Sequence, residues 1–175
     1  MPKDQYNKKI IYLPERLESQ LSELLEYPCT VVTAPSNFGK TTAIRECVHR
    51  LQEEREDLRV LWQTLLADDD TFFWEDLSEL FLPISETLSG LISKQAGRNL
   101  TQRRQFLKGL AACQVAEGQE VLVVIDADDF GCSDNIREFF EVLVKNCPAW
   151  LHLVLIGRRP LLKWDSRLYL YGMVH

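Results

Sequence analysis

The chain has 175 residues, of which 46% are hydrophobic and 26% are charged. This length and composition are typical of one globular domain with its own core, and they exclude a disordered or fibrous protein. With 26 acidic and 20 basic residues the net charge is −6. That charge argues against a nucleic-acid-binding surface, because phosphate contacts need clustered lysine and arginine. We expect residues 1–175 to form a single domain, the N-terminal part of a longer multidomain protein.

Three sequence features bear on location. No apolar stretch approaches the roughly 20 residues needed to cross a bilayer, and residues 1–9 lack the apolar core of a secretory signal. The five cysteines are odd in number and show no C-x-x-C spacing, so neither a disulfide framework nor a zinc site is indicated. We expect a cytoplasmic protein with no membrane contact.

The chain opens with a predicted helix, strand, turn and helix. Leucines at helical spacing predict the first helix across residues 17–25. The β-branched run 29–33 is typical of a strand buried on both faces. A turn over residues 34–39 then leads into a helix predicted over residues 40–54. This order is the start of a β-α-β unit.

The rest of the chain continues the alternation. Further strands are predicted at 59–64, 121–125 and 151–156, with a possible last strand at 167–171. Further helices are predicted at 72–81, at 85–98 with breaks at Gly90 and Gly97, at 101–117 closed by Gly118, and at 133–146. Such alternation predicts an α/β fold, in which a parallel sheet of about five strands is flanked by helices in an αβα sandwich.

The first turn has the layout of a phosphate-binding P-loop, G-x-x-x-x-G-K-[ST], with Ala34 in place of the first glycine. Such a loop wraps its N–H groups around a phosphate, and the following helix N-terminus adds more N–H groups and its dipole. A buried strand before the loop and a helix after it provide the required context. The predicted nucleotide-binding residues are Ala34, Pro35, Ser36, Asn37, Phe38, Gly39, Lys40, Thr41 and Thr42.

Four of these residues have distinct expected roles. Gly39 lets the backbone approach a phosphate closely, and Asn37 tolerates the positive φ that such a loop needs. Lys40 would place its ammonium against the β- and γ-phosphates, and the Thr41 hydroxyl would ligate Mg²⁺.

Asp126 follows the most apolar strand and is the candidate Walker B acid, which would hold Mg²⁺ directly or through water. Ligands of an open α/β sheet lie beyond the carboxyl ends of its strands, so the P-loop and Asp126 should meet. Hydrolytic proteins of this class commonly have a second acid next. Here Ala127 follows, and then Asp128 and Asp129. Either aspartate could polarise the attacking water, or both could form a solvated loop and helix cap.

Arg158 comes directly after the strand at 151–156, where its guanidinium could reach a γ-phosphate. Arg159 competes for this role, and both could instead be solvent-exposed. His152 is expected to be packed or locally paired, because no serine or cysteine partner is positioned beside it.

Taken together, these motifs resemble the MalT-type STAND ATPases, the large ATP-binding LuxR-type transcriptional regulators of bacteria. The similarity covers about residues 10–171. Five segments carry it: the entry at 13–17, the loop at 33–42, the second strand and following phenylalanines at 60–73, the Walker B strand at 123–126, and the strand ending in a sensor arginine at 153–158.

The resemblance implies an ASCE-type P-loop NTPase domain that uses ATP, ADP and Mg²⁺. It implies a switch that rests with ADP and self-associates with ATP, and downstream domains that include the only DNA-binding module. Two positions depart from the family pattern. Asn37 replaces the middle glycine of the loop, and Ala127 replaces the second acid of a D-D pair. The second departure predicts an ATPase that is slow or inactive alone.

Three other functions share some of these sequence features. A small-molecule or nucleotide kinase shares the P-loop and would need lid arginines, for which Arg98, Arg103 and Arg104 are candidates, although a solvated helix face explains them better. A GTPase is disfavoured because no N-K-x-D motif follows a late strand. A domain that binds nucleotide only for stability is the third.

Overall fold

The computed structural model describes residues 15–65, 70–96, 99–127, 134–159 and 162. Its four strands are β1 (Cys29–Thr33), β2 (Leu58–Leu65), β3 (Glu120–Ala127) and β4 (Leu151–Gly157). The helices are α1 (Glu15–Ser22), α2 (Lys40–Glu54), α3 (Asp70–Phe81), α4 (Glu86–Ile92), the 3-10 helix η1 (Ser93–Ala96), α5 (Leu100–Ala112) and α6 (Asp134–Lys145). All strand pairs are parallel, in the order β1-β4-β3-β2.

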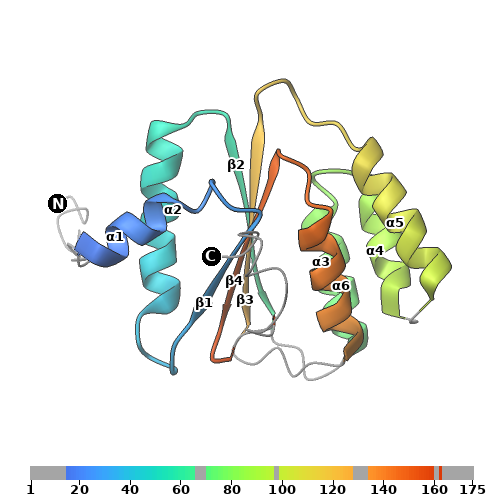
Figure 1. Cartoon of the computed structure of the whole chain (residues 1–175), viewed down its shortest axis with the longest axis horizontal. Coiled ribbons are helices and arrows are strands. Elements are labelled where there is room, and N and C mark those ends of the chain that lie inside the picture. The colour runs from blue at the N-terminus through green and yellow to red at the C-terminus, as the bar shows by residue number, and fades with distance from the viewer. Residues whose placement is uncertain (1–14, 66–69, 97–98, 128–133, 160–161, 163–175) are drawn as a thin grey trace, which may run out of the picture.

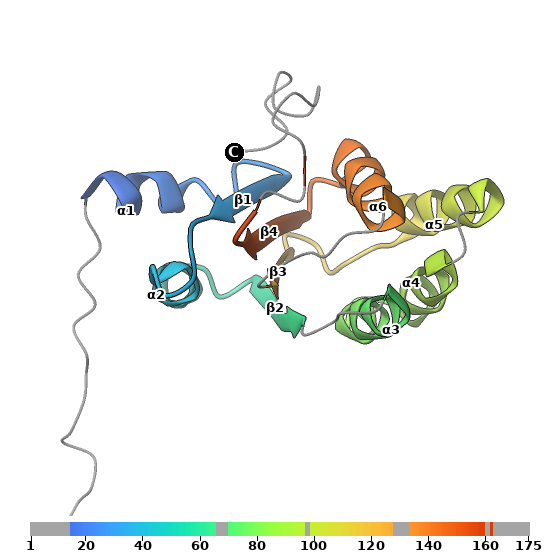
Figure 2. The ribbon, with the colours of Figure 1, turned by 90° about the horizontal axis from the view of Figure 1, so that it is seen from below.

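Helices cover both faces of the sheet (Figure 1). α1 and α2 pack on one face and α3 to α6 on the other, as the end view in Figure 2 also shows. Successive residues of β3 alternate between the layers, with Val124 in the α2 layer and Ile125 in the opposite one. The predicted αβα sandwich is confirmed. The possible strand at 167–171 lies outside the described residues.

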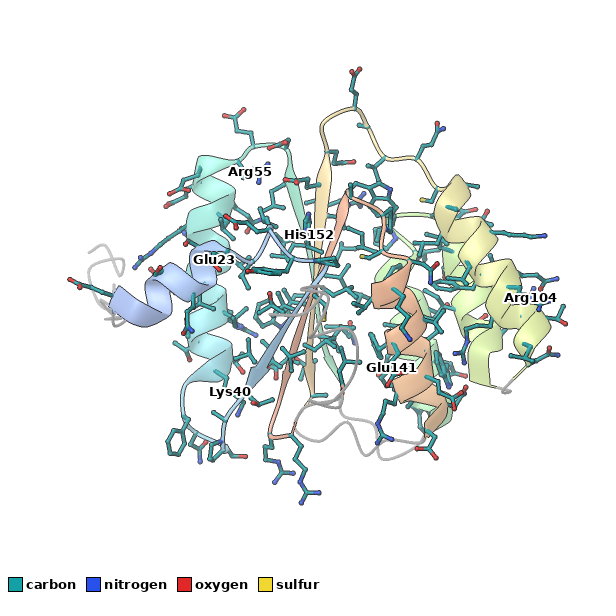
Figure 3. The ribbon with its side chains drawn as sticks, viewed as in Figure 1. Glu23, Lys40, Arg55, Arg104, Glu141 and His152 are labelled. Atoms are coloured by element: carbon teal, nitrogen blue, oxygen red, sulfur yellow. The ribbon has the colours of Figure 1, made fainter. Side chains whose placement is uncertain are left out.

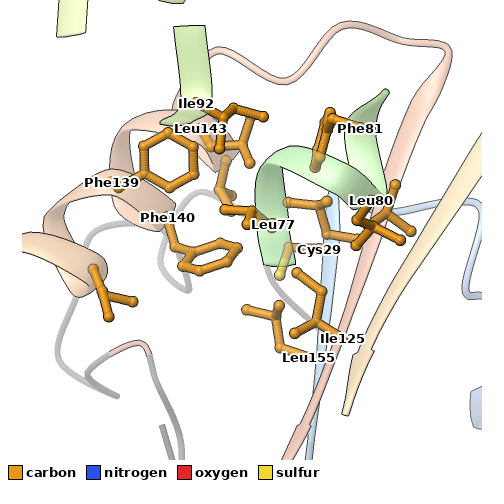
Figure 4. Close-up of a cluster of buried hydrophobic side chains, with 14 of the residues drawn as sticks. Cys29, Leu77, Leu80, Phe81, Ile92, Ile125, Phe139, Phe140, Leu143 and Leu155 are labelled. Carbon is orange, nitrogen blue, oxygen red and sulfur yellow. The ribbon is translucent and has the colours of Figure 1, made fainter. Parts of the chain in front are cut away.

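The larger core cluster lies between the sheet and α3 to α6 and is rich in aromatic rings. The ring of Phe139 meets Trp74 edge-on at 5.1 Å between centroids and lies 5.0 Å from Phe106. Figure 4 shows Phe139 and Phe140 of α6 beside aliphatic side chains of α3 and of the strands, including Leu77 and Leu155. Rings from three helices thus bind the outer layer together.

The smaller cluster holds the helix that follows the predicted P-loop. Ile44, Cys47 and Val48 are buried on one face of α2, at the i, i+3, i+4 spacing of an amphipathic helix. They pack against Val124 and Ile156 of the two central strands. This contact fixes the N-terminus of α2 at the carboxyl end of the sheet.

Gly90 was predicted to break a helix, and this is wrong. It lies inside α4, whose first turn is capped by the Ser85 hydroxyl accepting from the N–H of Leu88 at 3.3 Å. Leu88 and Ile92 are fully buried on either side of Gly90. Their burial offsets the helix-propensity cost of glycine, which is roughly 1 kcal/mol. The second predicted break, Gly97, lies outside the described residues.

The fifth α-helix is shorter than predicted, since it ends at Ala112 instead of near residue 117. Gly118 has φ 77° and belongs to a tight turn before β3, in which the N–H of Gln119 donates to the carbonyl of Ala116 at 3.0 Å. Gly118 therefore serves the strand entry and not the helix end. Within the described part of the chain, no helix is long and apolar enough to span a bilayer.

Candidate functional site

The predicted phosphate-binding turn connects β1 to α2. The N–H of Ala34 donates to the carbonyl of Gly157 at 3.4 Å, which ties the start of the turn to β4. Asn37 has φ 66° and Gly39 has φ 76°, so two residues near the helix entry adopt the left-handed conformation. The expectation that Asn37 tolerates positive φ is confirmed.

The N-terminus of α2 has the properties of an anion site. Its N-cap residue is Gly39, which has no side chain to accept from the amides of the first turn, and that turn contains no acid. The first intrahelical bond runs from the N–H of Ala43 to the carbonyl of Gly39 at 2.8 Å. The amides of residues 40–42 and the positive end of the helix dipole are thus available to an anion.

Lys40 spans the loop. Its Nζ donates to the carbonyl of Ala34 at 2.7 Å and to that of Pro35 at 3.0 Å. Because an ammonium group has three donors, one remains for an anion while the other two hold the loop closed. The predicted contact with the β- and γ-phosphates needs only this third donor, or the replacement of one carbonyl partner of Lys40 by a phosphate oxygen.

A cavity of about 300 Å³ opens between the turn and the sheet. It is lined by Ser36, Asn37, Gly39, Lys40, Thr41, Thr42 and Asp126. A Cβ built at Gly39 would meet nothing within 4 Å, so the backbone borders open space there. A cavity of this size suits a phosphate chain rather than a whole nucleotide. Phe38 is 73% exposed and does not line the cavity.

Thr41 and Asp126 meet directly, as predicted. The Thr41 hydroxyl donates to Oδ2 of Asp126 at 2.7 Å, joining the first turn of α2 to the end of β3. A hydroxyl and a carboxylate provide the oxygen ligands that Mg²⁺ prefers. No group of three or more His, Cys, Asp or Glu side chains in the described residues could hold a metal alone. A magnesium ion at this pair would take its remaining ligands from phosphate oxygens and water.

The residue after Asp126 faces away from the cavity. Ala127 is 3% exposed and packs in the cluster under α3 to α6, because successive strand residues point to opposite faces. Position 127 therefore lies on the opposite face of the sheet from Asp126, and its alanine side chain has no carboxylate. Asp128 and Asp129 lie outside the described residues.

The carboxyl edge also holds the predicted arginines. β4 ends at Gly157, and Arg158 and Arg159 follow as exposed residues.

His152 lies toward the other end of β4, where its Nδ1 is 3.1 Å from the carbonyl of Tyr27 and its Nε2 is 3.5 Å from Oε1 of Glu120. Figure 3 shows Lys40 and Arg55 at the two ends of α2, with His152 nearer the Arg55 end. The expected local pairing of His152 is confirmed.

The arginines considered for a kinase lid have a structural role or lie on a surface. Arg103 donates to Oδ1 of Asn135 at 3.1 Å and lies 5.8 Å from the ring of Phe139, so it ties α5 to α6. The predicted solvated face is therefore wrong for Arg103. It is right for Arg104, which is exposed on the outer side of α5 (Figure 3). Arg98 lies outside the described residues.

Thr64 is a site neighbour that the motifs did not reveal. It is in register with Asp126 in the β2–β3 pair and is exposed. Its position at the end of the predicted strand 59–64 was the available signal, but strand order cannot be read from local sequence.

Among solved structures the chain is similar in fold to the structure of Drosophila ORC bound to DNA, with a TM-score of 0.52 and 14% identity. The alignment covers 94% of this chain and 44% of that one. The Cdc6p crystal structure from Pyrobaculum aerophilum aligns with a TM-score of 0.49 and 20% identity, over 85% of this chain and 41% of that one.

This chain thus spans less than half the length of either protein. No family model matches the sequence, and no curated protein matches it. At 14% identity, the likeness to the ORC structure shows a shared fold and nothing finer. The parallel sheet flanked by helices, with the β1–α2 turn at its carboxyl edge, is an α/β fold.

Proposed function

We propose that this chain is a nucleotide-binding domain that takes ATP or ADP with Mg²⁺, with the phosphate chain in the cavity between the β1–α2 turn and β3. One observation carries the proposal: the Thr41 hydroxyl donates to Asp126 at 2.7 Å, beside a helix N-terminus whose amides have no side-chain cap. Phosphate chains are bound by amides, a lysine and a metal acting together. The described cavity has a residue for each of these contacts.

Each group of site residues would contact a different part of the ligand. The amides of residues 40–42 and the Lys40 ammonium would bind phosphate oxygens. Thr41 and Asp126 would hold Mg²⁺, which when bound neutralises charge on the phosphates. Arg158 or Arg159, at the end of β4, would contact a terminal phosphate and so distinguish ATP from ADP. The adenine specificity rests on the resemblance of the loop to the STAND ATPases.

The same resemblance supports the finer proposal that the domain is the ATP/ADP switch of a bacterial signal-responsive transcriptional regulator. In that role it would self-associate or contact downstream domains, and any DNA would be bound by a domain outside this chain. Hydrolysis would be weak, because position 127 faces the apolar core. An acid from Asp128 or Asp129 is the remaining way to activate water.

A thermal-shift experiment tests nucleotide binding. Ligand at 100 times its dissociation constant adds about 2.7 kcal/mol, which raises the melting temperature of a domain of this size by roughly 5–10 °C. ATP and ADP with Mg²⁺ should produce this rise, and GTP should produce less.

Lys40→Ala should abolish the rise while its melting temperature without nucleotide stays within a few degrees of the parent. Lys108→Ala removes an exposed lysine on α5 and is the matched control. The proposal is wrong if Lys40→Ala and Lys108→Ala respond to nucleotide alike.

Phosphate release at saturating ATP separates a switch from an autonomous enzyme. We expect well under one turnover per second, below the usual range of enzymes. A parent rate above about one per second would contradict the switch and favour an ATPase or a kinase.

A further inference from the structure

Thr64 and Asp126 lie side by side on adjacent strands. They are Cα partners in the parallel pairing of β2 with β3, at a strand spacing of about 4.8 Å. Partners in register project from the same face of a sheet. Thr64 therefore lies next to the acid that Thr41 contacts from α2.

The packing of β2 identifies that face. Trp62, two residues before Thr64, packs in the cluster under α2, and the guanidinium of Arg45 lies 5.0 Å from its ring centroid. Because side chains alternate along a strand, Thr64 faces the α2 side as well. Unlike Trp62, it is exposed, and it lies near the carboxyl end of the strand, beside Asp126.

Three oxygen-bearing side chains thus reach one edge of the sheet from three elements: Thr41 from α2, Asp126 from β3 and Thr64 from β2. The position after Asp126 cannot supply another, since Ala127 faces the opposite layer. On the described residues, the polar neighbour of Asp126 across the sheet is a threonine.

We propose that Thr64 is a positioning residue whose hydroxyl holds a water molecule of the Mg²⁺ shell against Asp126. This inference rests on the proposed function. Mg²⁺ gives up its waters reluctantly and usually keeps several, and a hydroxyl can both donate to and accept from such a water. A neutral hydroxyl orients water without taking its proton, so this arrangement supports metal binding and slow hydrolysis together.

The test measures how nucleotide affinity depends on Mg²⁺ concentration. Thr64→Val keeps the β-branched shape that suits a strand and removes the hydroxyl. It should raise the Mg²⁺ concentration needed for half-maximal tightening of ADP binding by about tenfold, the size of effect seen for outer-shell partners of a metal. Its ADP affinity in EDTA should equal that of the parent, and Thr64→Ser should restore the parent behaviour.

Thr87→Val, at an exposed position of α4, is the matched control and should change neither quantity. Thr64→Ala provides a second variant without a hydroxyl if valine disturbs folding. Equal Mg²⁺ dependence in Thr64→Val and the parent would overturn the inference and leave the proposed function intact. An equal loss of affinity in EDTA would also overturn it, since it would indicate a structural role. A parent that binds no nucleotide would instead refute the proposed function.

Discussion

Asn37 adopts a backbone conformation that few side chains tolerate. Its φ of 66° lies in the left-handed region, where asparagine and glycine are accepted and β-branched residues are strained by roughly 1–2 kcal/mol. We expect Asn37→Val to weaken ADP binding about tenfold, because the strain opposes the loop shape that we propose binds phosphate. Asn37→Gly should bind as the parent does. Equal affinities for the two variants, measured by titration, would show that the left-handed conformation is not required.

Arg103 and Arg104 are neighbours in sequence with different environments. Arg103 is half-buried between Asn135 and the ring of Phe139, and burial lowers its pKa. Arg103→Ala should reduce the free energy of unfolding by about 1–2 kcal/mol, through loss of a hydrogen bond and a cation–π contact. Arg104→Ala should change it by less than about 0.5 kcal/mol. Urea denaturation measures both changes. Equal losses of unfolding free energy in the two variants would refute the contacts assigned to Arg103.

At the scale of elements, the alternation of β3 determines what position 127 can do. Ala127 is 3% exposed within the apolar cluster. Ala127→Asp should therefore lower the free energy of unfolding by about 3 kcal/mol or more, because an unpaired carboxylate would be buried. Ala116→Asp, on the exposed turn before β3, should cost under about 1 kcal/mol. Urea denaturation of the two variants makes the comparison. An Ala127→Asp protein of parent stability with faster hydrolysis would contradict this account.

Local sequence was sufficient for β1, α2 and the turn between them, because a β-branched strand, a glycine–lysine–threonine turn and an amphipathic helix each carry a local signal. The approach of Thr41 to Asp126 followed from the rule for carboxyl ends of parallel strands. The face of the sheet from which the Ala127 side chain projects could not be predicted in this way. Residues 121–125 are apolar throughout since both faces of β3 are covered, so their sequence shows no alternation.

The remaining differences arise from contacts between distant segments. Gly90 remains helical because Leu88 and Ile92 are buried against other elements. The pairing of Thr64 with Asp126 depends on the order of the strands, and Arg103 on the packing of α5 against α6. Local patterns contain none of this information.

At the scale of the whole molecule, a buried thiol, Cys29, and a half-buried one, Cys147, make the free energy of unfolding depend on alkaline pH. Burial raises the pKa of Cys147 to about 12 from the ordinary value of 9.0, and it raises the pKa of Cys29 too. The unfolded chain loses these protons near pH 9 while the folded chain keeps them. Their stabilising contribution to the free energy of unfolding is therefore complete below pH 9 and declines as the pH rises toward 12.

Urea denaturation at pH 8 and pH 10 measures this contribution. Between the two pH values, the free energy of unfolding of the parent should fall by about 1 kcal/mol more than that of Cys147→Ala. The variant lacks one of the thiols whose ionisation favours unfolding. The comparison of losses cancels the packing cost of the substitution itself. Equal losses in the two proteins would show that Cys147 ionises alike in the folded and unfolded chains.

The central claim is that the β1–α2 turn and Asp126 together bind a nucleotide phosphate chain and its metal. Calorimetric titration of ADP into the purified chain, with Mg²⁺ and separately with EDTA, tests it most directly. We predict one site per chain, tighter binding with Mg²⁺, and an Asp126→Asn variant that loses the Mg²⁺-dependent gain while keeping its affinity in EDTA. A parent that binds no ADP, or an Asp126→Asn variant that weakens binding equally with and without Mg²⁺, would contradict the claim.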